Sequence, residues 1–430
     1  MKINRLSFVS RTIGSAALGV IVSGHAARAQ LLSNYIPSSL TGYDVMPGVT
    51  VTSRLHPEDD PLTMRFGNWQ IAPQFSQAVG YDDNVLGAPG KHGSVLIDTQ
   101  GSVQTIYDSI INHVEFDADF GRFGYPDLPT QNYTNWSARG GWSHEFDPEN
   151  VLGLGYSHYG LNQTPTGIDS TGVFQPIPYH VDVATVSYKA IRGPWTFVPI
   201  FDFAATQFTN STNNNGVGNL GAAGLNRNTE SGSLATFYEF APQRNVVVVV
   251  RGTTAQYTQG QPKPNYNDLS FLGGFDFDVT GLVRFRGLVG YETRDYQNAA
   301  FQNHSSPIFE GTIIWTPTGL TTLTLSVLRR IEDANEAIQT GYTYTQAGLV
   351  VDHEYQRNIL LQGRFSIQNA NYIQSHTTQT LYDTGASATY VLNRNLRLSA
   401  SYDFIAAQQQ LPFSSNYTRN IVLLQLKVAI

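Results

Sequence analysis

Three adjacent polar residues, Asp82, Asp83 and Asn84, follow an alternating run that ends at Tyr81 and precede a loop of Gly, Pro and small residues. A D-x-[DN] pattern can supply oxygen ligands to calcium, and two acids at the rim of a cavity could catalyse hydrolysis. Asp and Asn also begin turns, because their side chains bond to nearby backbone groups. No late bidentate Glu completes a calcium loop, so a turn is the favoured interpretation and the other two remain alternatives.

The remaining sequence predicts no catalytic residue, no metal site and no cofactor. The chain has no G-x-S-x-G for a serine hydrolase and no H-E-x-x-H for zinc, and its ten His residues are scattered. No Walker or dinucleotide-binding glycine motif follows a predicted strand. We therefore expect that the protein is not an enzyme.

A row of three acids, Glu115, Asp117 and Asp119, occupies one face of an alternating segment and has no evident partner. On the inside of a pore, such a row would favour cations or uncharged, hydroxyl-rich solutes over anions. Aromatic residues on the same side could stack on sugar rings, although packing against the lead-in or folding a loop is the favoured interpretation. They are Phe123, Tyr133, Tyr159 and Phe237.

Opposite charges recur across the turn centred on Gly281. If that turn closes a hairpin, residues whose numbers sum to 562 are opposite one another. The resulting pairs are Asp278–Arg284, Asp276–Arg286 and Asp268–Arg294. Each pair is worth about 0.2–1 kcal/mol, so the pairs could simply stabilise the hairpin or could form a polarised pore lining.

Apolar and polar residues alternate along most of the chain after residue 67, which is typical of a sheet with one apolar face. In "HVEFDADFGRF", for example, Val114, Phe116 and Phe120 share the face opposite the acids. Eighteen such segments are predicted. They are residues 68–81, 94–107, 111–124, 132–147, 151–162, 179–192, 195–208, 230–241, 245–257, 269–280, 282–296, 307–316, 321–332, 341–354, 357–369, 378–391, 396–407 and 417–430.

The connections between these segments alternate between short and long. "DPEN", "RGP" and "LNRN" are short, whereas "NQTPTGIDSTGVFQPIP" and "TNSTNNNGVGNLGAAGLNRNT" are long. A bacterial outer-membrane barrel has short periplasmic turns, long outer loops and an even number of strands. The bilayer also requires closure, since an open sheet edge in lipid leaves backbone groups unpaired. We therefore predict a closed antiparallel transmembrane β-barrel of 18 strands, with 16 as the next choice.

The N-terminus resembles a secretory signal peptide over residues 1–29, with basic residues, a short apolar region and the cleavage pattern Ala27-Arg28-Ala29. The signal holds four of the 26 basic residues and no acid. The rest of the chain thus carries 22 basic and 33 acidic residues, a formal charge of −11. An acidic exported chain is a poor partner for nucleic acid. Without cysteines, its stability must come from elsewhere, and a large closed sheet would suffice.

Residues 30–66 are rich in proline and are predicted to form an extended periplasmic lead-in or a plug, before the barrel at 67–430. The stretch from Val49 to Val85 resembles the opening of the putative β-barrel porin 2 family. The matching residues are Arg54, Pro57, Arg65, Gly67, Pro73 and Tyr81-Asp82-Asp83-Asn84-Val85. The resemblance implies a Gram-negative outer-membrane barrel, in a family often encoded near exopolysaccharide genes.

The final segment, "YTRNIVLLQLKVAI", is a strand that could close the barrel, although such barrels usually end in Phe or Trp rather than Ile430. The expected partners are outer-membrane lipid, the barrel assembly machinery and a hydrophilic solute or polysaccharide. The predicted function is porin-like passage or export of that solute. The alternatives are an outer-membrane hydrolase and a structural or adhesive surface barrel with a closed lumen.

Overall fold

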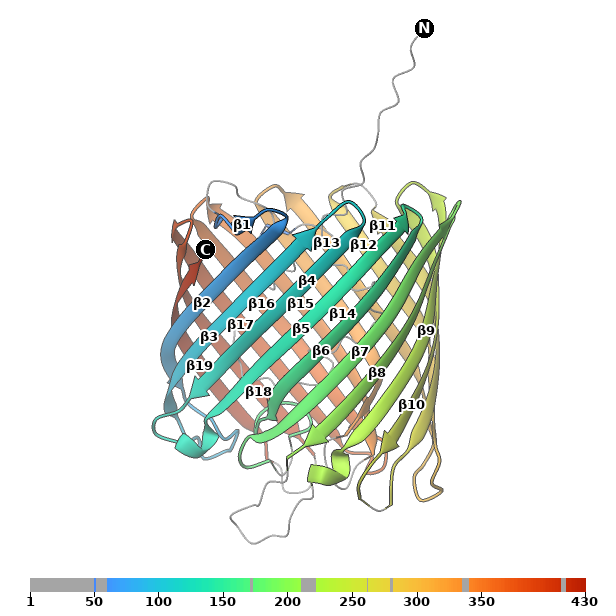
Figure 1. The fold of residues 1–430 in the computed structure, drawn as a ribbon. Coiled ribbons are helices and arrows are strands. Elements are labelled where there is room, and N and C mark those ends of the chain that lie inside the picture. Colours follow the sequence, from blue (N-terminus) through green and yellow to red (C-terminus); the bar gives the residue numbers. More distant parts are fainter. Residues whose placement is uncertain are drawn as a thin grey trace.

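The computed structural model describes residues 50–51, 60–170, 173–209, 222–260, 262–278, 281–334, 340–410 and 415–430. Strands β2 to β19 form one closed antiparallel ring of eighteen strands, shown in Figure 1. Every predicted segment is one of these strands, with its ends within about three residues. Their bounds are β2 Trp69–Asp82, β3 Ser94–Asp108, β4 Asn112–Gly124, β5 Tyr133–Asp147, β6 Asn150–Gln163, β7 Ile177–Arg192, β8 Trp195–Phe208, β9 Arg227–Ala241, β10 Arg244–Tyr257, β11 Tyr266–Asp278, β12 Val283–Tyr296, β13 His304–Thr318, β14 Thr321–Asp333, β15 Gly341–Gln356, β16 Ile359–Tyr372, β17 Thr378–Asn393, β18 Leu396–Gln409 and β19 Tyr417–Ala429.

The alternation of side chains divides each strand between an outer apolar face and an inner polar face. Phe116 is 48% exposed on the outside of the ring, while its neighbours Glu115 and Asp117 lie on the other face. Phe277 likewise faces outward and packs against Phe240 and Phe275. Such apolar exposure is stable only in contact with lipid, which identifies the outer face as the membrane-facing surface.

Aromatic rings gather on the outer surface near the ends of the strands. Near the end with short turns, Trp69 packs on Tyr107, and Trp195 packs on Tyr238. Aromatic side chains with a polar atom suit the boundary between hydrocarbon and head groups. Gly101 makes room for one outer ring, since a Cβ there would lie 2.4 Å from the ring of Phe120.

Short turns lie at the end of the barrel that carries the C-terminus, at the top of Figure 1, and the longer loops lie at the other end. Positive backbone φ angles make these turns tight. Gly193 has φ +59° between β7 and β8, and Gly281 has φ +70° between β11 and β12. Glycine adopts this conformation without steric cost, which explains its position at both turns.

The first and last full strands close the ring. The β19–β2 ladder runs from Ile421 opposite Asp82 to Ala429 opposite Gln74. Ile430 continues it, because its backbone N–H donates to the carbonyl of Pro73 at 3.1 Å. The terminal residue is therefore part of the barrel seam although it is not aromatic.

A short strand, β1 (Met64–Phe66), pairs with β2 within the segment predicted to be lead-in, so the sheet begins slightly earlier than residue 67. Two other parts of that segment contact the inner wall. Val51 is buried and its N–H donates to Thr322 Oγ1 at 3.0 Å, and Asp60 forms an ion pair with Arg397 at 3.2 Å. The predicted signal peptide and the rest of the lead-in lie outside the described residues. Among the described residues, no helix is long and apolar enough to cross a membrane.

Candidate pore lining and constriction

The acidic row of β4 lies on the inner wall, as predicted, but it has partners. Asp119 accepts a hydrogen bond from Ser137 at 2.6 Å and lies 3.4 Å from Arg139. Glu115 accepts a hydrogen bond from the Gln104 side chain at 2.7 Å. The His113 ring also lies 3.8 Å from the Glu115 carboxylate.

Asp117 lies between these two acids and is opposite Arg139 in the β4–β5 ladder. The expectation of an unpartnered row is therefore wrong. Arg139 is on the next strand, twenty residues after Asp119 in the chain, so no local pattern reveals it. The wall here combines negative and positive charge, which weakens the preference for cations that a bare acidic row would have.

The β11–β12 hairpin has the predicted register, with Asp268 opposite Arg294, Asp276 opposite Arg286 and Asp278 opposite Arg284. Two of the three predicted ion pairs form. Arg286 lies 3.1 Å from Asp276, and Arg294 lies 2.8 Å from Asp268.

The third pair does not form, because Asp278 accepts a hydrogen bond from the Gly281 backbone at 3.0 Å. Arg284 lies 3.7 Å from Asp276 instead. A carboxylate next to a tight turn satisfies the turn's own N–H first, and the nearby arginine then contacts the next carboxylate along the strand.

Arg294 belongs to a larger buried network at the loop end of the barrel. Its guanidinium lies over the Tyr266 ring, 3.7 Å from the centroid, and contacts Asp333 at 2.7 Å. Asp333 also contacts Arg227 at 2.9 Å. One carboxylate from β14 thus joins arginines from β12 and β9, which a flat ladder of neighbouring strands could not bring together.

The polar triad at the rim forms a turn. The Asn84 N–H donates to Asp82 Oδ1 at 3.0 Å, and the Asn84 side chain bonds Ala88 and the carbonyl of Thr418. Asp82 is completely buried and accepts a hydrogen bond from Arg419 Nε at 2.9 Å. Both carboxylate oxygens of Asp82 therefore point to the guanidinium and cannot contact a substrate.

Asp83, the least buried member of the triad, binds Lys91 at 2.6 Å and the Asn420 side chain at 2.7 Å. Partial burial raises the pKa of Asp83. Hydrogen bonds from Lys91 and Asn420 together lower it by more, so the net pKa is below the ordinary value. The ionised carboxylate thus connects the first loop to the last strand. Across the described part of the chain, no group of three His, Asp or Glu residues could hold a metal ion.

The loop between β6 and β7 folds into the barrel, which the sequence did not indicate. Residues 166–170 are buried and reach the strands around the seam. The Asp169 N–H donates to Gln379 Oε1 at 2.8 Å, and Gln379 Nε2 donates to the Gly167 carbonyl at 2.8 Å. Arg419 Nη1 donates to Thr166 Oγ1 at 2.7 Å. A loop from one side of the ring is thus held by β17 and β19.

The outer end of the β14–β15 hairpin also turns inward. We call residues 330–334 and 340–344 the β14–β15 tip. The β13–β14 ladder ends at Phe309 opposite Arg329, although β14 continues to pair with β15 as far as Asp333 opposite Gly341. Beyond Arg329, β14 no longer pairs with β13, and the Ile331 N–H donates instead to Glu292 on the inner wall at 3.1 Å.

Pro307 explains part of this break, because it has no N–H to offer to β14. Arg329 Nε instead donates to the Pro307 carbonyl at 3.1 Å. The tip places Tyr342 and Tyr344 in the lumen, where both are almost fully buried and pack with Tyr372 and Ile168. The two inward segments therefore meet and narrow the loop end of the barrel.

Among the described residues, the four inner aromatic residues pack mainly on neighbouring strands rather than on the lead-in, and Phe123 shares a cluster with Ile168 of the β6–β7 loop. Phe123 stacks on Tyr133 with ring centroids 4.6 Å apart, and Tyr159 is buried beside Tyr179. Phe237 packs against a cluster around Val247. These rings support the wall and the inward segments and leave little ring surface for a solute.

A family model described as "Putative beta-barrel porin 2" matches residues 56–430. A comparison with curated proteins found no match. Among solved structures, OccK2 (OpdF) of Pseudomonas aeruginosa in complex with glucuronate is 9% identical, with 84% of this chain and 98% of that chain covered and a TM-score of 0.46. The outer membrane protein opdK of P. aeruginosa is 11% identical, with 84% and 99% covered and a TM-score of 0.45. A BenF-like porin of Pseudomonas fluorescens Pf-5 is 9% identical, with 85% and 100% covered and a TM-score of 0.46.

Proposed function

Because the chain belongs to the putative beta-barrel porin 2 family and is a β-barrel of the Gram-negative outer membrane, we propose that it is a passive channel for small hydrophilic solutes. The observation that supports this proposal is the inner wall of the closed ring. It carries charged, amide and hydroxyl groups, such as Glu115, Arg139 and Gln104, on a barrel wide enough to hold water. An apolar lumen would not hydrate a polar solute.

The two inward segments set the size of that solute. The buried contacts of Asp169 with Gln379 and of Asp333 with Arg294 hold the β6–β7 loop and the β14–β15 tip inside the loop end. A sugar or an amino acid is far smaller than a polysaccharide, which would require both segments to move. Small solutes are therefore the favoured cargo. Export of an exopolysaccharide, which is a much larger solute, is the alternative.

The lead-in contributes at the opposite end. Its described residues lie against the inner wall near the short turns, because Val51 is hydrogen-bonded to Thr322 and Asp60 forms an ion pair with Arg397. We infer that the lead-in narrows the periplasmic exit. The proposed function has no covalent step, and the acid at the rim that was considered for hydrolysis, Asp82, is buried against Arg419.

Planar-bilayer recording tests the proposal directly. We expect the purified full-length protein to give stepwise ion currents. A wild-type chain that gives no current at any voltage would show that the lumen is closed, as in a structural or adhesive barrel.

Liposome swelling with galactose and with dextran tests the size of the solute. Swelling with galactose alone is expected. Equal permeation of dextran would contradict the small-solute proposal and favour polysaccharide passage.

A further inference from the structure

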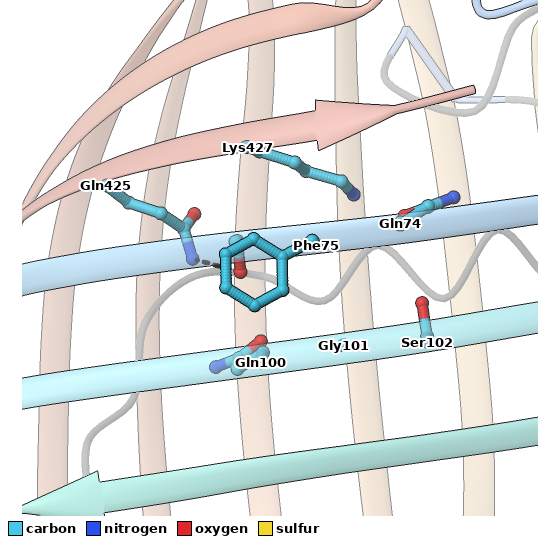
Figure 2. Close-up of a pocket in the computed structure, with 8 residues that line it drawn as sticks. Gln74, Phe75, Gln100, Gly101, Ser102, Gln425 and Lys427 are labelled. Carbon is cyan, nitrogen blue, oxygen red and sulfur yellow. Dashed lines mark hydrogen bonds between the residues drawn. The ribbon is translucent and has the colours of Figure 1, made fainter.

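A small, open pocket lies at the barrel seam, on the part of the wall near the short turns, where β19, β2 and β3 are neighbours (Figure 2). Six polar side chains on the inner side of these strands line it. They are Gln74, Ser76, Gln100, Ser102, Gln425 and Lys427. Figure 2 shows Gln425 and Lys427 extending from β19 toward β2, and Gln100 and Ser102 on β3.

Lys427 is the charged group of this pocket, and no acid of the described part of the chain is paired with it. Within the described residues, its ammonium forms no ion pair and no hydrogen bond. Its direct neighbour on β18 is Arg397, another cation. Like charges opposite one another across two strands are destabilising, so packing alone does not favour this arrangement.

Several arginines elsewhere on the inner wall are held by a carboxylate, although Arg251 on β10 forms no ion pair within the described residues. Arg139 contacts Asp119, Arg286 contacts Asp276, and Arg364 contacts Asp403 and Asp383. At the seam, Lys427 and Arg397 are adjacent, and among the described residues the one acid paired with either of them is Asp60, which binds Arg397. A carboxylate from the lead-in is therefore already bound beside Lys427, and one positive charge remains.

The neutral groups of the pocket also have unused hydrogen-bonding capacity. The side chains of Gln74 and Ser102 form no hydrogen bond with any described residue, whereas Gln425 Nε2 donates to Ser76 Oγ at 3.2 Å. Amide and hydroxyl groups can both donate and accept, which matches the hydroxyls of a sugar. The nearest acid of the β4 row, Asp119, is opposite Ser102, but Ser137 and Arg139 on the far side hold its carboxylate.

We propose that this seam pocket binds an anionic, hydroxyl-bearing solute, such as a sugar acid, with Lys427 on the anionic group and the neighbouring amides and hydroxyls on the solute's hydroxyls. The inference deepens the proposed channel function by naming a solute class and a site at the periplasmic end. It predicts that the anionic group of the solute contacts Lys427 near the periplasmic exit, once the solute has passed the mixed charges of the β4–β5 wall.

Isothermal titration calorimetry on the full-length protein in detergent tests the site. Galacturonate is the probe, galactose is its neutral match, and inorganic phosphate is the simple anion. We expect galacturonate to bind, galactose to bind far more weakly, and Lys427→Gln to reduce galacturonate affinity by about tenfold, as expected for loss of a charge-assisted hydrogen bond. Lys427→Arg should retain binding, which separates loss of charge from misfolding.

Lys189→Gln is the matched control, because Lys189 lies near the short-turn end of β7, is exposed, and is remote from the seam. Equal binding by wild type and Lys427→Gln, equal loss in Lys189→Gln, or equal affinity for galactose would overturn the proposal. Lys427-dependent binding of phosphate as well would identify the anionic group as the recognised feature. Ion current without galacturonate binding would refute the proposed binding site and support the channel function. Galacturonate binding without ion current would support the binding site and refute the channel function.

Discussion

The two ends of the lumen are built in different ways. Toward the short turns, inner side chains mainly contact residues on neighbouring strands, as Arg286 contacts Asp276 and Gln425 contacts Ser76. At the loop end, contacts cross the ring, as Gln379 on β17 holds the β6–β7 loop and Asp333 on β14 reaches Arg227 on β9. The first kind of contact follows from strand register, and the second requires a segment to leave the wall.

This difference separates the tasks of the two ends. Contacts between neighbouring strands keep the wall cylindrical and leave the space in the middle for water and solute. Contacts across the ring fill that space with buried groups such as Tyr342 and Ile168. We therefore expect the loop end to limit passage more than the turn end, where only the lead-in narrows the exit.

Releasing the β6–β7 loop from the inner wall should have the largest effect on the difference between the two ends of the lumen. Replacing residues 164–170 by a Gly-Ser linker of equal length removes the contacts to Gln379 and Arg419 while keeping the chain connected. Because a ring of eighteen strands is wide without inward segments, single-channel conductance should rise by about twofold or more. Bilayer recordings that show unchanged conductance would mean that this loop does not form the narrowest point.

The buried pair at the rim should dominate the stability of the loop end. Asp82→Ala leaves the Arg419 guanidinium buried without its carboxylate, and removal of one partner of a buried pair costs about 3–5 kcal/mol of unfolding free energy. Urea unfolding in detergent, followed by tryptophan fluorescence, measures this loss.

Asp83→Ala is the matched control, since the neighbouring Asp83–Lys91 pair is partly exposed and pairs of that kind contribute about 0–1 kcal/mol. Similar losses for the two variants would show that burial at Asp82 is not the deciding factor.

The β11–β12 hairpin offers a smaller and sharper test at the turn end. Asp276→Asn removes the carboxylate shared by Arg284 and Arg286, and cross-strand charge pairs are worth about 0.2–1 kcal/mol each. Asp278→Asn keeps a side-chain oxygen that can accept the Gly281 N–H and removes no ion pair, so it should cost less. The same unfolding measurement ranks the two, and a larger loss for Asp278→Asn would contradict the observed pairing of Arg284.

Much of the architecture could be predicted from residue patterns. Side chains alternate with period two in a strand, so the membrane-facing side of each segment was evident from residues such as Phe116 and Phe277. Turn geometry then gave the hairpin register of Asp276 with Arg286, which the structure confirms. Arg139 was missed because its pairing with Asp119 depends on the loop length between β4 and β5 rather than on a tight turn.

The amino-acid sequence by itself determined the eighteen strands, their apolar outer face and the alternation of short and long connections, because each is a local consequence of pleating and turn geometry. Only the tertiary structure decided that the β6–β7 loop and the β14–β15 tip enter the lumen, and that Lys427 lies beside Arg397 with no ion pair to a described residue. These features depend on which distant strands the closed ring brings face to face, and closure is a property of the whole chain.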